Sequence, residues 1–384
     1  MLTRRFFLAS GAAAGLATIG FPRVAFARAN TDRRFIFIIQ RGAADGLHIV
    51  APTGDPLFAG IRGDFAQDLG GGAKLDSFFT LHPALAETGK MYGAREALFV
   101  HAVASPYRDR SHFDGQNVLE TGGTAAYRVK DGWMNRLLGL LPQQEAKALA
   151  LSATVPMALR GQHEVASYAP SKLPAASDDL MMRVAGLYRS DPQLHSLWST
   201  AMKTRMTAGD LSDTGGKNGT ATGELAAKML AGENGARVAM IETGGWDTHS
   251  AERGRLTAQL RGLDNMVAAM KSGLGADWAK TLVIVATEFG RTVAPNGTGG
   301  TDHGQASAAM LLGGAVAGGQ VIADWPGLSQ RALYEGRDLM PTMDLDALIA
   351  GALAQHYGLE RARVMTALFP ESRGSALSKA VISA

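Results

Sequence analysis

The sequence predicts an α/β protein with a doubly wound, mainly parallel sheet and helices on both faces of that sheet. Residues 35–39 and 282–286 are wholly apolar, which is the pattern of strands buried on both faces. Residues 251–274 and 342–356 repeat apolar side chains every three or four positions, as amphipathic helices do. Strands of this kind alternating with such helices favour a parallel sheet covered on both sides.

The other elements are predicted from weaker patterns. Shorter apolar segments at 98–100 and 238–241 indicate two further strands, and Thr342 is the expected N-cap of the second helix. Residues 154–235 break the alternation with polar-faced helical segments and a Gly/Thr/Asp-rich stretch from 207 to 223. We therefore expect an insertion over 154–235 that carries a mobile surface loop.

Composition excludes several classes of protein. The 384 residues contain no cysteine, so disulfides, thiolate nucleophiles and cysteine-ligated metals are absent. Three arginines in residues 1–27 account for the whole excess of 38 basic over 35 acidic side chains. The chain without those residues is near neutral, which gives no electrostatic reason to expect nucleic-acid binding.

Residues 1–29 resemble a twin-arginine export signal. Arg4 and Arg5 precede an apolar run of about 15 residues, shorter than the roughly 18–20 that a membrane span needs. Small residues suitable for cleavage occur at 25–27 and 27–29. We expect the twin-arginine translocase as export partner, a single domain over residues 30–384 that is periplasmic or secreted, and no stable membrane span. An uncleaved membrane anchor is the alternative.

Polar side chains follow four of the predicted strands, where the chemistry of parallel α/β folds is located. These loops cover residues 40–46, 105–114, 242–249 and 287–304. Asp247 and His249 follow a Gly-Gly turn, and Asp302 and His303 supply the same ligand types in a glycine-rich loop. Carboxylates and imidazoles without thiolates suit Zn²⁺ or Mn²⁺. A helix-capping Asp beside a surface His is the alternative for the first pair.

Ser111 is a candidate nucleophile, with His112 beside it. A hydroxyl at the start of a helix faces a site that favours anions, because free N–H groups and the helix dipole attract negative charge. A simple N-cap is an equal alternative for this serine. Arg41, Arg110 and Arg291 could each bind an anionic oxygen with two N–H groups, or form ordinary ion pairs.

Six motifs together resemble an exported bacterial family, domain of unknown function 1501, over nearly the whole chain after the signal. That family is grouped with the alkaline phosphatase and sulfatase superfamily, so the resemblance implies an alkaline-phosphatase-like fold with two metals at the strand ends. The motifs are the twin-arginine leader and residues 41–47, 111–113, 244–249, 287–292 and 301–304.

The superfamily's metal ligands map onto this sequence with departures. Asp247, His249 and His303 look like the first metal's ligands, although the spacing is Asp-x-His where the superfamily has Asp-x-x-x-His. Asp45 resembles an acidic ligand of the second metal but lies a few residues late. Glu288 stands at the superfamily's Asp-His pair, where Phe289 removes a ligand. The resemblance therefore implies one well-formed metal site.

The leading functional hypothesis is an exported, metal-dependent hydrolase of an anionic ester of the phosphate or sulfate type. A divalent metal, Zn or Mn, would act with Ser111 as nucleophile, His112 beside it, and Arg291 neutralising developing charge. The alternative is a non-catalytic, metal-stabilised binding or accessory protein that takes a cell-envelope polymer, and Phe289 favours that alternative.

Overall fold

The computed structural model describes residues 32–142, 147–152, 154–168 and 219–383, and a few isolated positions between 184 and 198. The predicted signal at 1–29 and most of the predicted insertion lie outside these residues and stay predictions. Within the described part, no helix combines the length and apolar character that crossing a membrane requires.

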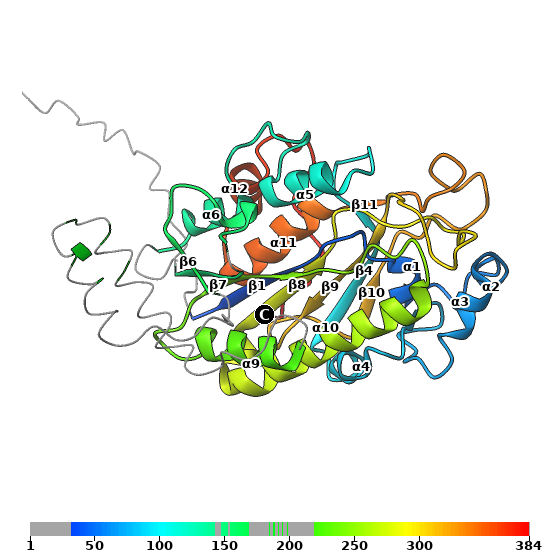
Figure 1. Cartoon of the computed structure of the whole chain (residues 1–384), viewed down its shortest axis with the longest axis horizontal. Coiled ribbons are helices and arrows are strands. Elements are labelled where there is room, and N and C mark those ends of the chain that lie inside the picture. Colours follow the sequence, from blue (N-terminus) through cyan, green and yellow to red (C-terminus); the bar gives the residue numbers. More distant parts are fainter. Residues whose placement is uncertain are drawn as a thin grey trace, which may run out of the picture.

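The described residues form a nine-stranded sheet of order β10-β4-β9-β8-β1-β7-β5-β6, with β11 paired to β4 (Figure 1). β9 is antiparallel to both of its neighbours and the other pairs are parallel. A two-stranded antiparallel sheet joins β2 (Val50–Ala51) and β3 (Thr80–Leu81). The main strands are β1 (Arg34–Gln40), β4 (Ala97–Ala104), β5 (Ala148–Leu151), β6 (Val165–Ser167), β7 (Val238–Thr243), β8 (Thr281–Ala286), β9 (Ser307–Leu312), β10 (Gln320–Ile322) and β11 (Met343–Asp344).

β1 shows why the sheet is buried on both faces. Phe35, Phe37 and Ile39 point into one hydrophobic cluster, and Ile36 and Ile38 point into another. All seven residues of β1 are buried, and β7 and β8 flank it in parallel register. The wholly apolar run at 35–39 therefore reflects two cores, one on each side of the strand.

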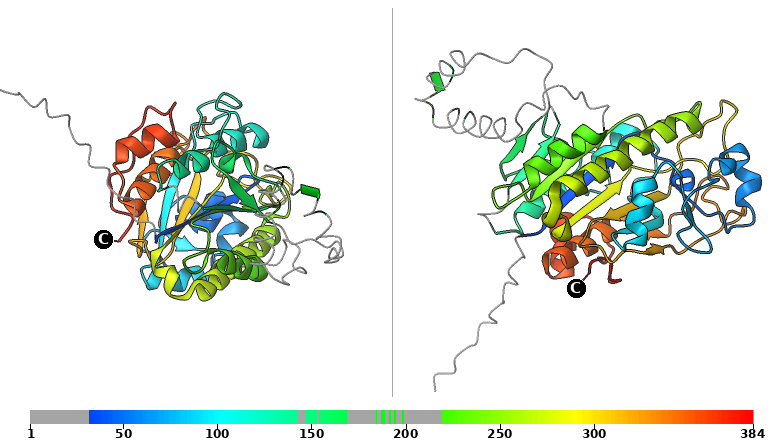
Figure 2. Two further views of the ribbon diagram at one scale, coloured as in Figure 1. Left: turned by 90° about the vertical axis from the view of Figure 1, so that its left-hand side faces the viewer. Right: turned by 90° about the horizontal axis from the view of Figure 1, so that it is seen from below.

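Helices cover both faces, as Figures 1 and 2 show. One layer packs on the cluster of Phe37 and contains α5 (His112–Thr121), α6 (Trp133–Leu138), α11 (Leu345–Tyr357) and α12 (Arg361–Leu368). The other packs on the cluster of Ile38 and contains α4 (Ala86–Gly93), α9 (Gly219–Leu230) and α10 (Glu252–Leu274). Three short helices, α1 (Gly46–Ile49), α2 (Phe58–Arg62) and α3 (Asp64–Gln67), follow β1. The doubly wound, mainly parallel fold predicted from the sequence is confirmed.

Two local predictions differ from the structure. α11 begins after Asp344, whose carboxylate accepts the N–H groups of Asp346 and Ala347, whereas the hydroxyl of Thr342 donates to the carbonyl of Asp324. α9 occupies 219–230, so the last residues of the stretch predicted as a loop are helical. α9 and β6 both belong to the layered fold, although they lie within the range 154–235.

Candidate metal centre

Three imidazoles and one carboxylate converge beyond the carboxyl ends of the parallel strands. His112 opens α5 after β4, Asp247 and His249 follow β7, and His303 lies between β8 and β9. Asp247 Oδ1 lies 3.5 Å from His112 Nε2, 3.5 Å from His303 Nε2 and 3.1 Å from His249 Nε2. His249 Nε2 and His303 Nε2 are 2.9 Å apart. Four potential ligand atoms from three strand-end loops therefore gather around Asp247 Oδ1.

The other ring nitrogen of each histidine fixes the tautomer. His112 Nδ1 donates to Glu288 Oε1 at 2.8 Å, His249 Nδ1 to Asp302 Oδ1 at 3.1 Å, and His303 Nδ1 to the carbonyl of Arg110 at 2.9 Å. Carbonyls and ionised carboxylates only accept, so each Nδ1 carries the proton. Each neutral imidazole then presents an Nε2 lone pair to the centre, the arrangement that outer partners impose on metal ligands.

These residues fit a divalent cation. Two Nε2 lone pairs at 2.9 Å repel each other unless a positive charge lies between them, and His112 Nε2 is buried without a hydrogen-bond partner. Three imidazole nitrogens and one carboxylate oxygen are a ligand set suited to Zn²⁺ or Mn²⁺. His112, Asp247 and His303 place one ligand atom each within 4.8 Å of the others.

Hydrogen bonds shift the pKa values of the charged side chains at the centre. Burial alone would raise the pKa of Asp247, but the bond from Arg291 at 2.6 Å lowers it below the ordinary value. Burial likewise opposes ionisation of Glu288, and bonds from His112 and Gln116 lower its pKa nonetheless. The hydrogen bond to Glu288 raises the pKa of His112, whereas burial lowers that of His303. Both carboxylates therefore remain available as anions.

Asp302 and Glu288 lie behind the imidazoles, although the sequence predicted both as metal ligands. Asp302 accepts from His249 and Asn296, and Glu288 is fully buried beneath His112. Conversely, His112 was predicted as a catalytic neighbour of Ser111, and its ring faces the centre, where it could serve as a ligand. Its position directly after a strand-end loop was the signal in the sequence that could have identified it.

Arg291 does not face an anionic substrate as predicted. Its side chain is fully buried, and its N–H groups bond the carbonyls of Ala43 at 2.6 Å and Thr301 at 3.1 Å as well as Asp247. The guanidinium therefore ties three loops together and fixes the carboxylate of Asp247.

Asp45, which the resemblance assigns to a second metal, lies in a separate buried group with His48 and Glu252 whose ligand atoms are within 4.8 Å of one another, so it stays a candidate ligand there. Its carboxylate pairs with Arg62 at 2.5 Å inside the protein, beside His48 and Glu252. Burial raises the pKa of Asp45 to about 6, even though Arg62 opposes that shift. The guanidinium already supplies the positive charge that a metal would bring to this carboxylate.

Ser111 immediately precedes α5, but its side chain makes no capping hydrogen bond. Its backbone N–H donates to the hydroxyl of Tyr107 at 3.1 Å, and the residue is partly exposed. The hydroxyl thus lies beside the ligand His112 at a helix N-terminus that favours anions. Ser111 is thus the N-cap residue of α5 by position, but its hydroxyl is not engaged in capping.

Phe289 fills the position where the superfamily pattern has a second histidine. The ring is buried, stacks on His112 at 5.0 Å between centroids, and lies 5.3 Å from His303. It supports the two imidazoles from an apolar side. The structure therefore places packing, with no ligand atom, at this position.

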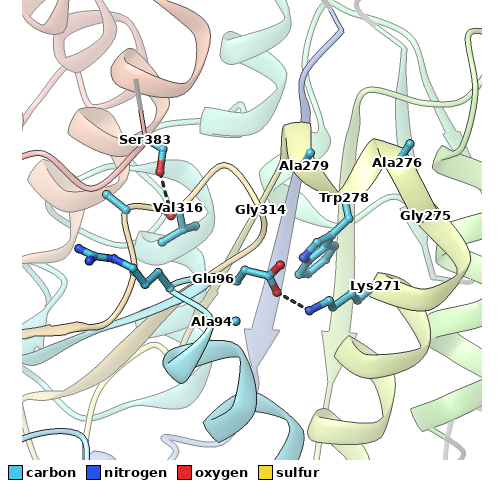
Figure 3. Close-up of a pocket in the computed structure, with 13 residues that line it drawn as sticks. Ala94, Glu96, Lys271, Gly275, Ala276, Trp278, Ala279, Gly314, Val316 and Ser383 are labelled. Atoms are coloured by element: carbon cyan, nitrogen blue, oxygen red, sulfur yellow. Dashed lines mark hydrogen bonds and ion pairs between the residues drawn. The ribbon is translucent and has the colours of Figure 1, made fainter.

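Two of the larger cavities outside the centre lie at opposite edges of the sheet. One of about 730 Å³ lies at the ends of β5 and β7, lined by Ser152, Glu242 and Trp246 among others. Another of about 680 Å³ lies where β4 and β8 begin, and it is lined by Trp278 and the ion pair of Glu96 with Lys271 (Figure 3). None of the predicted site residues lines the second cavity, which lies at the opposite edge of the sheet.

Fold and geometry together define a doubly wound α/β protein with a candidate metal centre at the carboxyl edge of its sheet. The chain belongs to the family described as "Protein of unknown function (DUF1501)", whose model matches residues 87–369. The resemblance noted in the sequence is thereby confirmed. No significantly similar sequence was found among curated proteins.

Several solved structures are similar at low identity. The C-terminal periplasmic domain of EcEptC from Escherichia coli, in complex with Zn, is 8% identical, with 74% of each chain covered and a TM-score of 0.37. The phosphonate monoester hydrolase SpPMH from Silicibacter pomeroyi is 11% identical, covering 89% of this chain and 78% of that one, with a TM-score of 0.38. Ps i-CgsB in complex with k-i-k-neocarrahexaose is 12% identical, covering 85% and 72%, with a TM-score of 0.43. At these values the function has to be argued from the chain's own residues.

Proposed function

We propose that this protein is a metal-dependent hydrolase of an anionic ester of the phosphate or sulfate type. The observation that carries the proposal is the convergence of three Nε2 lone pairs on Asp247 Oδ1, each fixed by an acceptor on its Nδ1–H. A neutral imidazole set with a carboxylate binds a divalent cation, and Zn or Mn suits it.

Each residue then has a defined task. His112, Asp247, His249 and His303 hold the metal, while Glu288, Asp302 and the carbonyl of Arg110 orient the imidazoles. When bound, the metal would polarise an ester oxygen or lower the pKa of a water molecule. Ser111 is the candidate nucleophile because its uncapped hydroxyl adjoins His112. Asp247 and His249 have side chains 46% and 44% exposed, so a substrate can approach from that side.

A non-catalytic, metal-stabilised binding or accessory protein of the cell envelope is the second candidate. Four protein ligands form a closed set, as in structural metal sites, whereas catalytic sites keep an open position. Phe289 removes a ligand that a second metal would need. In that case the metal would stabilise the fold, and the molecule that the protein binds would be a cell-envelope polymer.

Metal titration of the purified chain tests the centre, and turnover separates the two candidates. We expect a stoichiometric metal, a melting temperature that falls on chelation, and metal affinity lowered at least tenfold in His112→Ala but unchanged in the control His163→Ala. Chromogenic phosphate monoesters, phosphodiesters and sulfates then measure turnover, which Ser111→Ala should abolish with metal still bound. Bound metal without turnover favours the accessory protein, and an apoprotein indifferent to chelator refutes both candidates.

Export by the twin-arginine translocase completes the proposal and places the protein in the periplasm or outside the cell. The support is the Arg4-Arg5 leader with its short apolar run. Lys at both positions should leave the full-length precursor in the cytoplasm, as cell fractionation would show. Undiminished export of that variant would contradict the assignment.

A further inference from the structure

We propose that the centre takes esters whose anionic group carries one negative charge, such as phosphodiesters or sulfate monoesters, in preference to dianionic phosphate monoesters. This inference rests on the proposed function, because it requires a divalent cation at His112, Asp247, His249 and His303. It concerns the charge that the protein itself places around that cation.

The formal charges of the groups nearest the cation already cancel the charge of the cation. Asp247 is a ligand, Glu288 and Asp302 hold the ligands His112 and His249, and Arg291 bonds Asp247. Three carboxylates and one guanidinium leave a charge of −2, which one divalent cation cancels. The loaded centre is therefore neutral and has no excess positive charge for a substrate.

The surrounding loops add no free cation. The four strand-end loops, 40–46, 105–114, 242–249 and 287–304, contain four arginines and no lysine. Arg41 pairs with Glu120 and Glu242, and Arg110 pairs with Glu335 and Asp338.

The other two arginines face away from a substrate as well. Arg108 bonds the carbonyls of Ser105 and Tyr107 and lines a separate cavity with Asp344, while Arg291 is fully buried. Each arginine of these loops is thus committed to internal partners.

Arg337, from the segment before β11, is 48% exposed and bonds the carbonyl of His303 at 2.7 Å, but its charge is paired with Asp338 at 2.9 Å. The metal would be the positive group without such a carboxylate partner that an incoming anion meets there.

A second negative charge on the substrate would therefore go unmatched. The open side of the centre also carries Asp247 and Asp302, whose side chains are 46% and 52% exposed. These carboxylates would repel the second negative charge of a dianionic substrate, and the repulsion is strongest where water is partly displaced. A singly charged ester avoids most of this cost while its oxygen still reaches the metal.

Anion binding to the zinc-loaded full chain at pH 8 tests the inference without turnover. Methyl phosphate carries two charges at this pH because the second pKa of a phosphate monoester is about 6. Methyl sulfate and dimethyl phosphate carry one. Isothermal titration should show at least one of the two monoanions binding at least tenfold tighter than methyl phosphate. Which monoanion binds distinguishes a sulfate ester from a phosphodiester as the natural class.

Asp302→Asn provides a charge test at the centre, since an amide oxygen can still accept from His249 Nδ1. With metal content verified, it should improve methyl phosphate binding at least fivefold relative to the monoanions. Glu233→Gln removes an exposed charge before β7, at the opposite edge of the sheet. It should change neither the binding of methyl phosphate nor that of the monoanions. Tighter binding of methyl phosphate than of both monoanions, or failure of a metal-loaded protein to bind any of them, overturns this inference alone. A chain that takes up no metal refutes the proposed function and this inference with it.

Discussion

At the scale of single residues, the centre depends on which nitrogen of each imidazole carries the proton. The backbone contributes directly, because Arg110 adopts a left-handed conformation with φ of 60° and offers its carbonyl to His303 Nδ1. A non-glycine residue in this region is strained, and such strain concentrates where geometry serves a function. The side chain of Arg110 is held by Asp338 and Glu335, which keeps this conformation in place.

Glu288 should matter for metal binding although it is not a ligand. Its Oε1 accepts from Gly42 N and His112 Nδ1, each at 2.8 Å, and from Gln116 Nε2 at 3.0 Å. Glu288→Gln removes the charge that makes His112 a better ligand, so metal affinity should fall at least tenfold, about 1.4 kcal/mol. Competitive titration against a chelator measures it. Glu233→Gln, an exposed acid before β7 at the opposite edge of the sheet, is the control, and equal affinities in the two variants would count against the role.

Sequence reasoning identified which residues gather but not which way they face. Asp247, His249 and His303 lie at strand ends, and the parallel sheet brings their loops together. Whether a carboxylate binds a metal or an imidazole depends on loop contacts such as that between Asp302 and Asn296. Those contacts have no local sequence pattern, so Glu288 and Asp302 were assigned as ligands and His112 was not.

At the scale of elements, apolar strands were predictable and glycine-containing helices were not. β1 and β8 are buried on both faces, and the wholly apolar segments 35–39 and 282–286 predict this burial. α9 contains Gly219 and Gly223, which sequence analysis assigned to a loop. A Cβ at these positions would lie 1.9 Å from the carbonyl oxygen of Gly262 and 2.1 Å from that of Met266 on α10. These glycines therefore serve close packing of two helices, a role that only the tertiary structure reveals.

The loop after β1 also approaches the loop after β7 too closely for a side chain. Gly42 has φ of +120°, and a Cβ there would lie 2.4 Å from the backbone nitrogen of Asp247. Gly42→Ala should lower the free energy of unfolding by about 2 kcal/mol or more and weaken metal binding. Gly254→Ala, in open space on α10, should instead stabilise by about 0.5–1 kcal/mol. Urea unfolding measures the free energy of unfolding of both variants. A Gly42→Ala variant as stable as the wild type would contradict the close approach of the two loops.

At the scale of the whole molecule, the two cores enclose several histidines that must stay neutral. Burial lowers the pKa of His48, His82 and His101 to about 4 and that of His356 to about 3. His48, His82 and His101 are buried among aromatic side chains from distant segments, such as Phe65, Phe79 and Trp325, which no local pattern predicts.

Acid should therefore destabilise the protein before its carboxylates titrate. A histidine of the unfolded chain binds a proton below about pH 6.5, whereas the native residue stays neutral, so each one lowers the free energy of unfolding by up to ~1.4 kcal/mol per pH unit. Asp45, Glu120 and Asp346 act oppositely, because burial raises the pKa of each and so favours proton uptake by the folded state, but these are three groups against four. His356 Nε2 donates to the carbonyl of Arg34 at 3.0 Å, a bond that an amide can keep. With chelator present to remove metal effects, His356→Gln should reduce the stability lost between pH 7 and 5 by about 2 kcal/mol. Urea unfolding at both pH values measures this, with His163→Gln as the matched control. A loss as large in His356→Gln as in the wild type would mean that His356 takes up its proton in the native state.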